Sequence, residues 1–67
     1  MIIFDKLWEL MSEKNMSTYR LREIADVDSK TIKRLKNNMN TETNTLDRIC
    51  KALNCELSDI AEFIKDE

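Results

Sequence analysis

The sequence predicts an all-α fold of five short helices within one domain spanning residues 1–67. Two observations lead to this prediction. Apolar residues recur at a helical period along nearly the whole chain, and no linker, repeat or low-complexity run interrupts them. Hydrophobic residues make up 42% of the chain and charged residues 36%, which is an ordinary globular balance and not a disordered one.

The first helix is expected over residues 2–14. On a helical wheel, six apolar side chains share one broad arc, and charged and polar side chains fill the opposite side. The apolar arc is formed by Leu10, Ile3, Leu7, Met11, Phe4 and Trp8. This pattern is typical of a core helix with one face in water.

The second helix is expected over residues 18–25. Ser17 precedes it and can accept a hydrogen bond from a free amide of the first turn. Met16 before the cap and Leu21 inside the helix have the spacing of a hydrophobic staple. The inner face is expected to consist of Leu21, Ile24 and Ala25.

The third helix is expected over residues 29–37 and repeats the same signals. Asp28 is its predicted N-cap, and Val27 with Ile32 gives a second staple. Two capped and stapled helices separated by two or three residues of turn predict a helix-turn-helix.

Two more helices follow in the prediction. The fourth covers residues 44–53 with Thr43 as its cap, and its apolar stripe has the spacing i, i+3, i+4 and i+7. That stripe is Leu46, Ile49, Cys50 and Leu53. The fifth begins near Leu57 or Ser58 and is expected to carry Ile60, Phe63 and Ile64 inward.

Glycine is absent, although helix ends often need a residue in the left-handed region. Asp26, Asn38 and Asn54 stand at three predicted helix ends. Asp and Asn tolerate the left-handed conformation better than other non-Gly residues, so the turns are expected there.

Charge is distributed unevenly along the chain, whose formal net charge is -2. Residues 17–38 hold six basic and three acidic side chains, a net charge of +3. Residues 39–67 hold three basic and seven acidic side chains, a net charge of -4. The predicted helix-turn-helix is therefore the one basic part of an acidic protein.

The basic side chains gather on one side of the third predicted helix. With Ile32 turned inward, Lys30, Lys33, Arg34 and Asn37 fall within roughly 100° of one another. All four are hydrogen-bond donors, which suits the phosphates and the major-groove base edges of double-stranded DNA. A basic helix face is more often only solvated, and the helix-turn-helix spacing is what favours DNA binding here.

Two stretches, "STYRLREIADVDSKTIKRLKNN" and "TNTLDRICKALNCELSDI", resemble the phage repressor/Cro-like (XRE-type) helix-turn-helix family. The positions that match its pattern are Ser17, Leu21, Val27, Ile32, Leu46, Ile49, Ala52 and Leu53. The resemblance covers nearly the whole chain and implies a five-helix, lambda-repressor-like bundle. In this chain Asp26 replaces the usual Gly of the turn, and Arg22 replaces a small residue of the second helix.

The resemblance also implies where DNA would be bound. The third helix would enter the major groove, with Ser29, Lys30, Lys33 and Arg34 where base edges are read. Candidates for phosphate contacts are Thr18, Lys36 and Asn37. The expected function is that of a small cytoplasmic transcriptional regulator, with double-stranded DNA as its partner and a homodimer as its possible assembly.

Other kinds of chemistry find little support in the sequence. Histidine is absent, so a serine or cysteine triad cannot be built, and no enzyme is expected. Cys50 and Cys55 lack further soft ligands, so core packing is favoured over a metal site or any cofactor. The apolar N-terminal residues are interrupted by Asp5, Lys6 and Glu9, so no signal peptide or membrane span is predicted. No small-molecule ligand is expected.

A second interpretation is a protein-interaction module that uses the same fold, antitoxin-like or anti-repressor in kind. It is motivated by the acidic flank and by Trp8 at the edge of the first apolar arc. Phe63 and Ile64 leave a related choice open, because they either cap the core or contact a second copy.

Overall fold

Local capping determines where the helix-turn-helix begins and turns. The computed structural model describes residues 1–65. Helix α2 covers Thr18–Ala25, and helix α3 covers Ser29–Lys36, one residue shorter than predicted. The Ser17 hydroxyl accepts a hydrogen bond from the Arg20 amide at 3.1 Å, and the Asp28 carboxylate accepts one from the Thr31 amide at 2.8 Å. Both predicted N-caps are therefore confirmed.

The inner face of α2 is narrower than predicted. Leu21 and Ala25 are buried, and Val27 in the following turn is buried as well. Ile24 lies on the flank of the helix and is exposed, so its predicted place in the core is wrong. The reason is geometric, because Ile24 is about 60° around the helix from Leu21 and on the side away from Ala25.

The chain begins with a strand where the sequence predicted a helix. Strand β1 covers Ile2–Ile3, and helix α1 covers only Asp5–Glu13. The two elements are separated by Phe4, whose non-helical backbone has φ -119°. The Phe4 amide donates to the Asn38 side-chain oxygen at 2.9 Å, which ties the start of α1 to the segment after α3.

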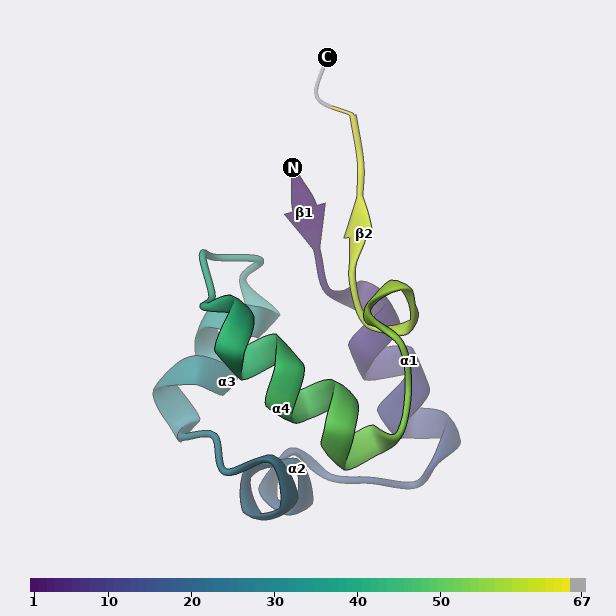
Figure 1. Cartoon of the computed structure of the whole chain (residues 1–67), viewed down its shortest axis with the longest axis vertical. Coiled ribbons are helices and arrows are strands. Elements are labelled where there is room, and N and C mark those ends of the chain that lie inside the picture. The colour runs from purple at the N-terminus through teal and green to yellow at the C-terminus, as the bar shows by residue number, and fades with distance from the viewer. Residues whose placement is uncertain (66–67) are drawn as a thin grey trace.

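A two-stranded antiparallel ribbon replaces the predicted fifth helix. A 3-10 turn, η1, covers Leu57–Asp59, and strand β2 then covers Glu62–Phe63. Ile2 pairs with Phe63 and Ile3 with Glu62, so the ends of the chain run side by side away from the helices (Figure 1). Met1 and Ile64 extend the ribbon through backbone hydrogen bonds of 2.6 and 2.8 Å.

The ribbon changes which side chains enter the core. Ile60 is fully buried, as predicted. Phe63 is 70% exposed and Ile64 is 39% exposed, so the prediction that they point inward is wrong. After Ile60 the chain leaves the bundle to pair with β1, and an extended backbone cannot direct residues i, i+3 and i+4 to one side.

Helix α4 covers Thr43–Leu53 and begins one residue earlier than predicted. Thr43 is therefore inside the helix, and the N-cap position belongs to Glu42, whose side chain makes no capping bond. Ile49 and Leu53 are buried. Leu46 and Cys50 are partly buried on the flank of the same stripe.

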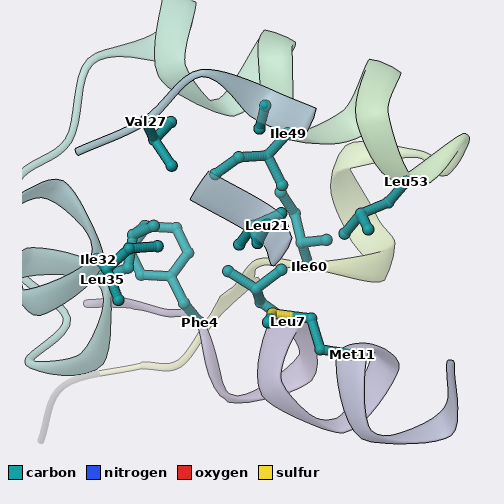
Figure 2. Packing of buried hydrophobic residues seen from close by; sticks show 11 residues of the cluster. Phe4, Leu7, Met11, Leu21, Val27, Ile32, Leu35, Ile49, Leu53 and Ile60 are labelled. Atoms are coloured by element: carbon teal, nitrogen blue, oxygen red, sulfur yellow. The ribbon is translucent and has the colours of Figure 1, made fainter. Parts of the chain in front are cut away.

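The core gathers side chains from all four α-helices that residues 1–65 contain and from the segment after η1 (Figure 2). Five of them are almost completely buried: Leu7, Leu21, Leu35, Ile49 and Ile60. α4 crosses the front of the view, between α3 and α2 on one side and α1 on the other (Figure 1). The fold is thus predominantly helical, with four α-helices and not the five predicted.

Left-handed residues end the helices without glycine. Asp26, Asn38 and Asn54 have φ values of 55°, 54° and 51°, as predicted from their positions. A fourth such residue, Asn15, has φ 53° and was not predicted. It follows α1, and the Met16 amide next to it bonds back to the Met11 carbonyl at 2.9 Å.

Candidate nucleic-acid interface

Helix α3 has one buried side and one exposed, cationic side. Ile32 and Leu35 point into the core, and their exposed fractions are 6% and 0%. The four candidates for base contacts are all exposed: Ser29, Lys30, Lys33 and Arg34. α3 therefore presents its donors outside the bundle, where a double helix could reach them.

The candidates for phosphate contacts are placed less uniformly. Thr18 lies in the first turn of α2 and is half-buried. The Lys36 ammonium lies 5.9 Å from the centre of the Trp8 ring, which places it on the flank of α3 that faces α1. The Asn37 side-chain amide donates to the Lys33 carbonyl at 2.9 Å and closes the end of α3. Lys36 and Asn37 are thus exposed, and each also contacts another residue of the same chain.

A polar hollow of about 200 Å³ lies between α3 and the start of α4. It is lined by Thr31, Arg34, Thr41, Glu42, Thr45 and Arg48. Two guanidinium groups and three hydroxyls face one carboxylate there, so the lining is rich in donors. We refer to it as the Arg48 hollow.

Arg48 is the functional candidate that sequence reasoning missed. Its Nε atom is buried and has no hydrogen-bond partner among the described residues. A buried donor without an acceptor costs about 1–3 kcal/mol. Arg48 lies within the acidic residues 39–67, so the sequence offered no reason to assign it to a basic site. Its place beside α3 depends on how α4 packs in the folded chain.

The helix-turn-helix accommodates both unusual residues of this chain, Asp26 in the turn and Arg22 in α2. Asp26 adopts the left-handed conformation with φ 55° and ψ 52°, and its amide bonds to the Arg22 carbonyl. Arg22 is exposed and borders a shallow hollow with Tyr19, Glu23 and Val27. Its side chain is therefore open to solvent, and Leu21 and Ala25 of the same helix are buried.

Asp28 adds a local negative charge at the head of α3. Hydrogen bonds from Thr31, from its side chain first and then from its backbone, hold the pKa of the Asp28 carboxyl below its usual value. Lys30 and Arg34 lower the pKa further through their charges. The carboxylate is thus ionised at neutral pH and stabilises the N-terminal end of the helix.

The two cysteines are free thiols that are partly buried against the core. Burial, followed by the proximity of Cys50, raises the pKa of the Cys55 thiol to about 11. Such a thiol stays protonated near neutral pH, so it is a poor nucleophile and a poor metal ligand. In residues 1–65, no cluster of three acidic or thiol side chains could hold a metal ion, and no helix is long and apolar enough to cross a membrane.

Trp8 is partly buried against the core, and Lys36 approaches its ring. A cation above an aromatic face is an attractive contact, so the Trp8 ring already has a partner within the chain. This placement does not favour the interpretation in which Trp8 anchors another protein.

The fold and its exposed basic helix define a helix-turn-helix protein, and comparison with known proteins identifies its family. The model of the Cro/C1-type HTH DNA-binding domain matches residues 6–66, and the chain belongs to this family. Among solved structures, the chain is similar to a crystal structure of the transcriptional regulator VanUg. The two share 34% sequence identity and a TM-score of 0.90, over 97% of this chain and 87% of the other. No curated protein matches the chain.

Proposed function

We propose that the protein is a transcriptional regulator that binds double-stranded DNA in a sequence-specific manner, with α3 in the major groove. The observation that carries this proposal is the division of α3 into a buried apolar side and an exposed side of donors. An α-helix fits the major groove, and its exposed donors can then reach the base edges. Membership of the Cro/C1-type family supports the same assignment.

The side chains of α3 would divide between bases and backbone. Lys30, Lys33 and Arg34 have the chemistry to donate to the N7 and O6 acceptors of guanine. Ser29 at the N-terminal end of α3 can donate or accept, so it suits either kind of base pair. Only these four exposed residues would supply sequence information.

Phosphate groups would be bound on both flanks of α3. On one flank, the Arg48 hollow offers the guanidinium group of Arg48. On the other flank, the N-terminal end of α2 with Thr18 offers backbone amides and a hydroxyl. Lys36 and Asn37 are exposed at the C-terminal end of α3 and would add contacts of lower specificity.

The uneven charge of the chain would direct the protein onto DNA in one orientation. Residues 17–38 carry a net charge of +3, and residues 39–67 carry -4. The acidic part would be repelled by phosphate, so the basic side of the protein would meet the duplex first. The same repulsion would weaken non-specific binding by other faces of the protein.

The base contacts are tested by selecting bound duplexes from a random pool and measuring their affinity by gel shift. Replacing Lys30 and Arg34 together by alanine should cost about 1–3 kcal/mol for each lost bidentate contact and relax specificity at those positions. Lys51→Ala is the control for each single replacement, because it removes one positive charge from the exposed surface of α4. Equal binding by the double variant and by wild type would contradict the assignment.

The Arg48 hollow is tested by the dependence of affinity on salt. Arg48→Ala should weaken every duplex to a similar degree and reduce the salt slope by about one, because one phosphate contact is lost. Specificity should stay as in the wild type. A variant with the wild-type salt slope would show that the hollow binds no phosphate.

A further inference from the structure

The two cysteines meet across the turn that ends α4. Asn54 adopts the left-handed conformation with φ 51°, and its amide donates to the Lys51 carbonyl at 3.3 Å. The next amide, that of Cys55, donates back to the Cys50 carbonyl at 3.0 Å. These two bonds define a Schellman motif, in which the side chains of the two outer residues usually contact each other. In this chain the two outer residues are Cys50 and Cys55.

The two sulfur atoms share one environment. Cys50 and Cys55 are free thiols, and both are partly buried against the hydrophobic core. Besides burial, the charge of Cys50 and a hydrogen bond with it raise the pKa of the Cys55 thiol, which means that the sulfur atoms are neighbours. Cysteines that can be bridged have Cα atoms about 4.4–6.8 Å apart, and a backbone hydrogen bond between the two residues favours such a separation.

We propose that Cys50 and Cys55 form a reversible intrachain disulfide and that a small-molecule disulfide is the oxidant. The bridge closes a ring over the last turn of α4 and leaves both hydrogen bonds of the Schellman motif in place. In this reaction the two thiols lose two electrons and two protons. The oxidant takes them up and is reduced to two thiols, so the exchange is balanced without a further reactant.

Cys50 is the thiol that the oxidant reaches first. It borders an open hollow of about 330 Å³ that is also lined by Leu46 and Leu57. Cys55 keeps its proton near neutral pH, because its pKa is raised to about 11, so Cys50 supplies the attacking thiolate. The Cys50 sulfur bonds to one sulfur of the oxidant, the S–S bond of the oxidant breaks, and its other half leaves as a thiolate. A mixed disulfide on Cys50 then stands next to the Cys55 thiol.

The second step closes the bridge within the chain. The Cys55 sulfur attacks the Cys50 sulfur, the bond from Cys50 to the small molecule breaks, and the departing thiolate takes the Cys55 proton. Once Cys50 is bonded to the oxidant it carries no charge, so one cause of the raised pKa of Cys55 disappears. The step is intramolecular between neighbouring groups, and such closeness offsets the remaining reluctance of Cys55 to lose its proton.

The bridge lies away from the candidate nucleic-acid interface. Cys50 and Leu46 border the same hollow beside α4, and Thr45 and Arg48 line the Arg48 hollow on another side of that helix. The ring comprises only residues 50–55, and a short ring constrains the unfolded chain less than a long one. We therefore expect oxidation to stabilise the end of α4 modestly and to leave the exposed side of α3 unchanged.

Equilibration of the full chain with reduced and oxidised glutathione, followed by acid quenching and mass spectrometry, tests the pairing. The wild type should lose two hydrogen atoms and remain a single chain. Cys55→Ala should stop at a mixed disulfide between Cys50 and glutathione, and Cys50→Ala should react more slowly than Cys55→Ala. A wild type that stops at the mixed disulfide, or that is linked only to other chains, would overturn the proposal.

The contribution of the fold is measured by repeating the equilibration in urea. The folded chain should favour the disulfide at least about ten-fold more than the unfolded chain, because the Schellman motif holds the sulfur atoms together. Asn54→Val should lose most of this preference, since a β-branched residue opposes the left-handed backbone, and Asn54→Gly should keep it. Equal constants for the folded and unfolded wild type would contradict the pairing. Because no DNA is present, the result is independent of whether the protein binds a duplex.

Discussion

The helix-turn-helix and the terminal ribbon are the two most different regions of the molecule. In the helix-turn-helix, each helix is fixed by its own cap and by core side chains such as Leu21 and Leu35, which are fully buried. In the ribbon, Ile2 and Phe63 face each other across two short strands and remain exposed. The first region presents charged side chains on helices that are packed against the core. The second presents apolar side chains on two short paired strands.

This difference determines how firmly each region holds the side chains that it exposes. A side chain that reads bases must be held in place, since affinity is lost when it has to be ordered on binding. A short two-stranded ribbon is only marginally stable alone, and it gains stability when another surface covers it. We therefore expect α3 to be rigid before DNA binds.

The largest expected effect comes from the buried side of α3. Leu35→Ala should lower the free energy of unfolding by about 2–5 kcal/mol, because a fully buried side chain leaves a cavity. A chain of this size has a total stability of about 3–10 kcal/mol, so the variant should lose a large part of it. Urea denaturation followed by circular dichroism measures the change.

Lys33→Ala is the matched control on the exposed side of the same helix. It should change the stability by less than about 0.5 kcal/mol, because it removes no buried contact. Similar losses for the two variants would mean that the two sides of α3 do not differ as their burial indicates.

The second effect concerns Asn38, which joins the two regions. Its side-chain oxygen accepts the Phe4 amide at 2.9 Å, and its backbone is left-handed. Asn38→Gly keeps the backbone conformation and should lose about 1 kcal/mol with the hydrogen bond. Asn38→Ala should lose about 1–2 kcal/mol more, because alanine is strained there. Equal denaturation midpoints for the two variants would contradict the role of the left-handed backbone.

The helix-turn-helix was predictable because its signals are local. Ser17 and Asp28 stand next to the amides that they cap, and Asp26 stands at the turn itself. The exposed side of α3 also follows from helical periodicity once Ile32 is placed inward. The family and the position of the basic side chains therefore follow from the amino-acid sequence alone.

The ribbon and the Arg48 hollow were not predictable, because both depend on contacts between distant residues. Phe63 has helical spacing from Ile60, and only its pairing with Ile2 makes that segment extended. Arg48 acquires its surroundings from the packing of α4 beside α3. A single sequence carries weak information on such pairings, since the same apolar residues suit either conformation.

A third, smaller effect tests the turn of the helix-turn-helix. Asp26→Gly should raise the free energy of unfolding by up to about 1 kcal/mol, because glycine adopts φ 55° without a steric cost. Asn54→Gly after α4 is a comparison at a second left-handed position outside this region. Thermal denaturation measures both. A loss of stability in Asp26→Gly alone would show that the Asp26 side chain contributes more than its backbone strain costs.

The smallest effect is a dependence on pH confined to the head of α3. Because Thr31 lowers the pKa of Asp28 in the folded state, Asp28 contributes stability above its unfolded pKa, near the ordinary value of 3.8. That contribution is lost as the pH falls through the lower, folded value. Asn is an equally good N-cap without a titrating proton, so Asp28→Asn should remove this part of the acid sensitivity.

Carboxyl NMR titration of Asp28, together with denaturation midpoints at a series of pH values, measures this dependence. The wild type and Asp28→Asn should differ by a constant amount near neutral pH, and the difference should change only in the acid range. Asp66→Asn is a control that removes a carboxylate far along the chain from this cap. An Asp28 that titrates at its ordinary value would mean that its bond to the Thr31 amide does not hold in solution. The head of α3 would then be held by its buried side chains alone.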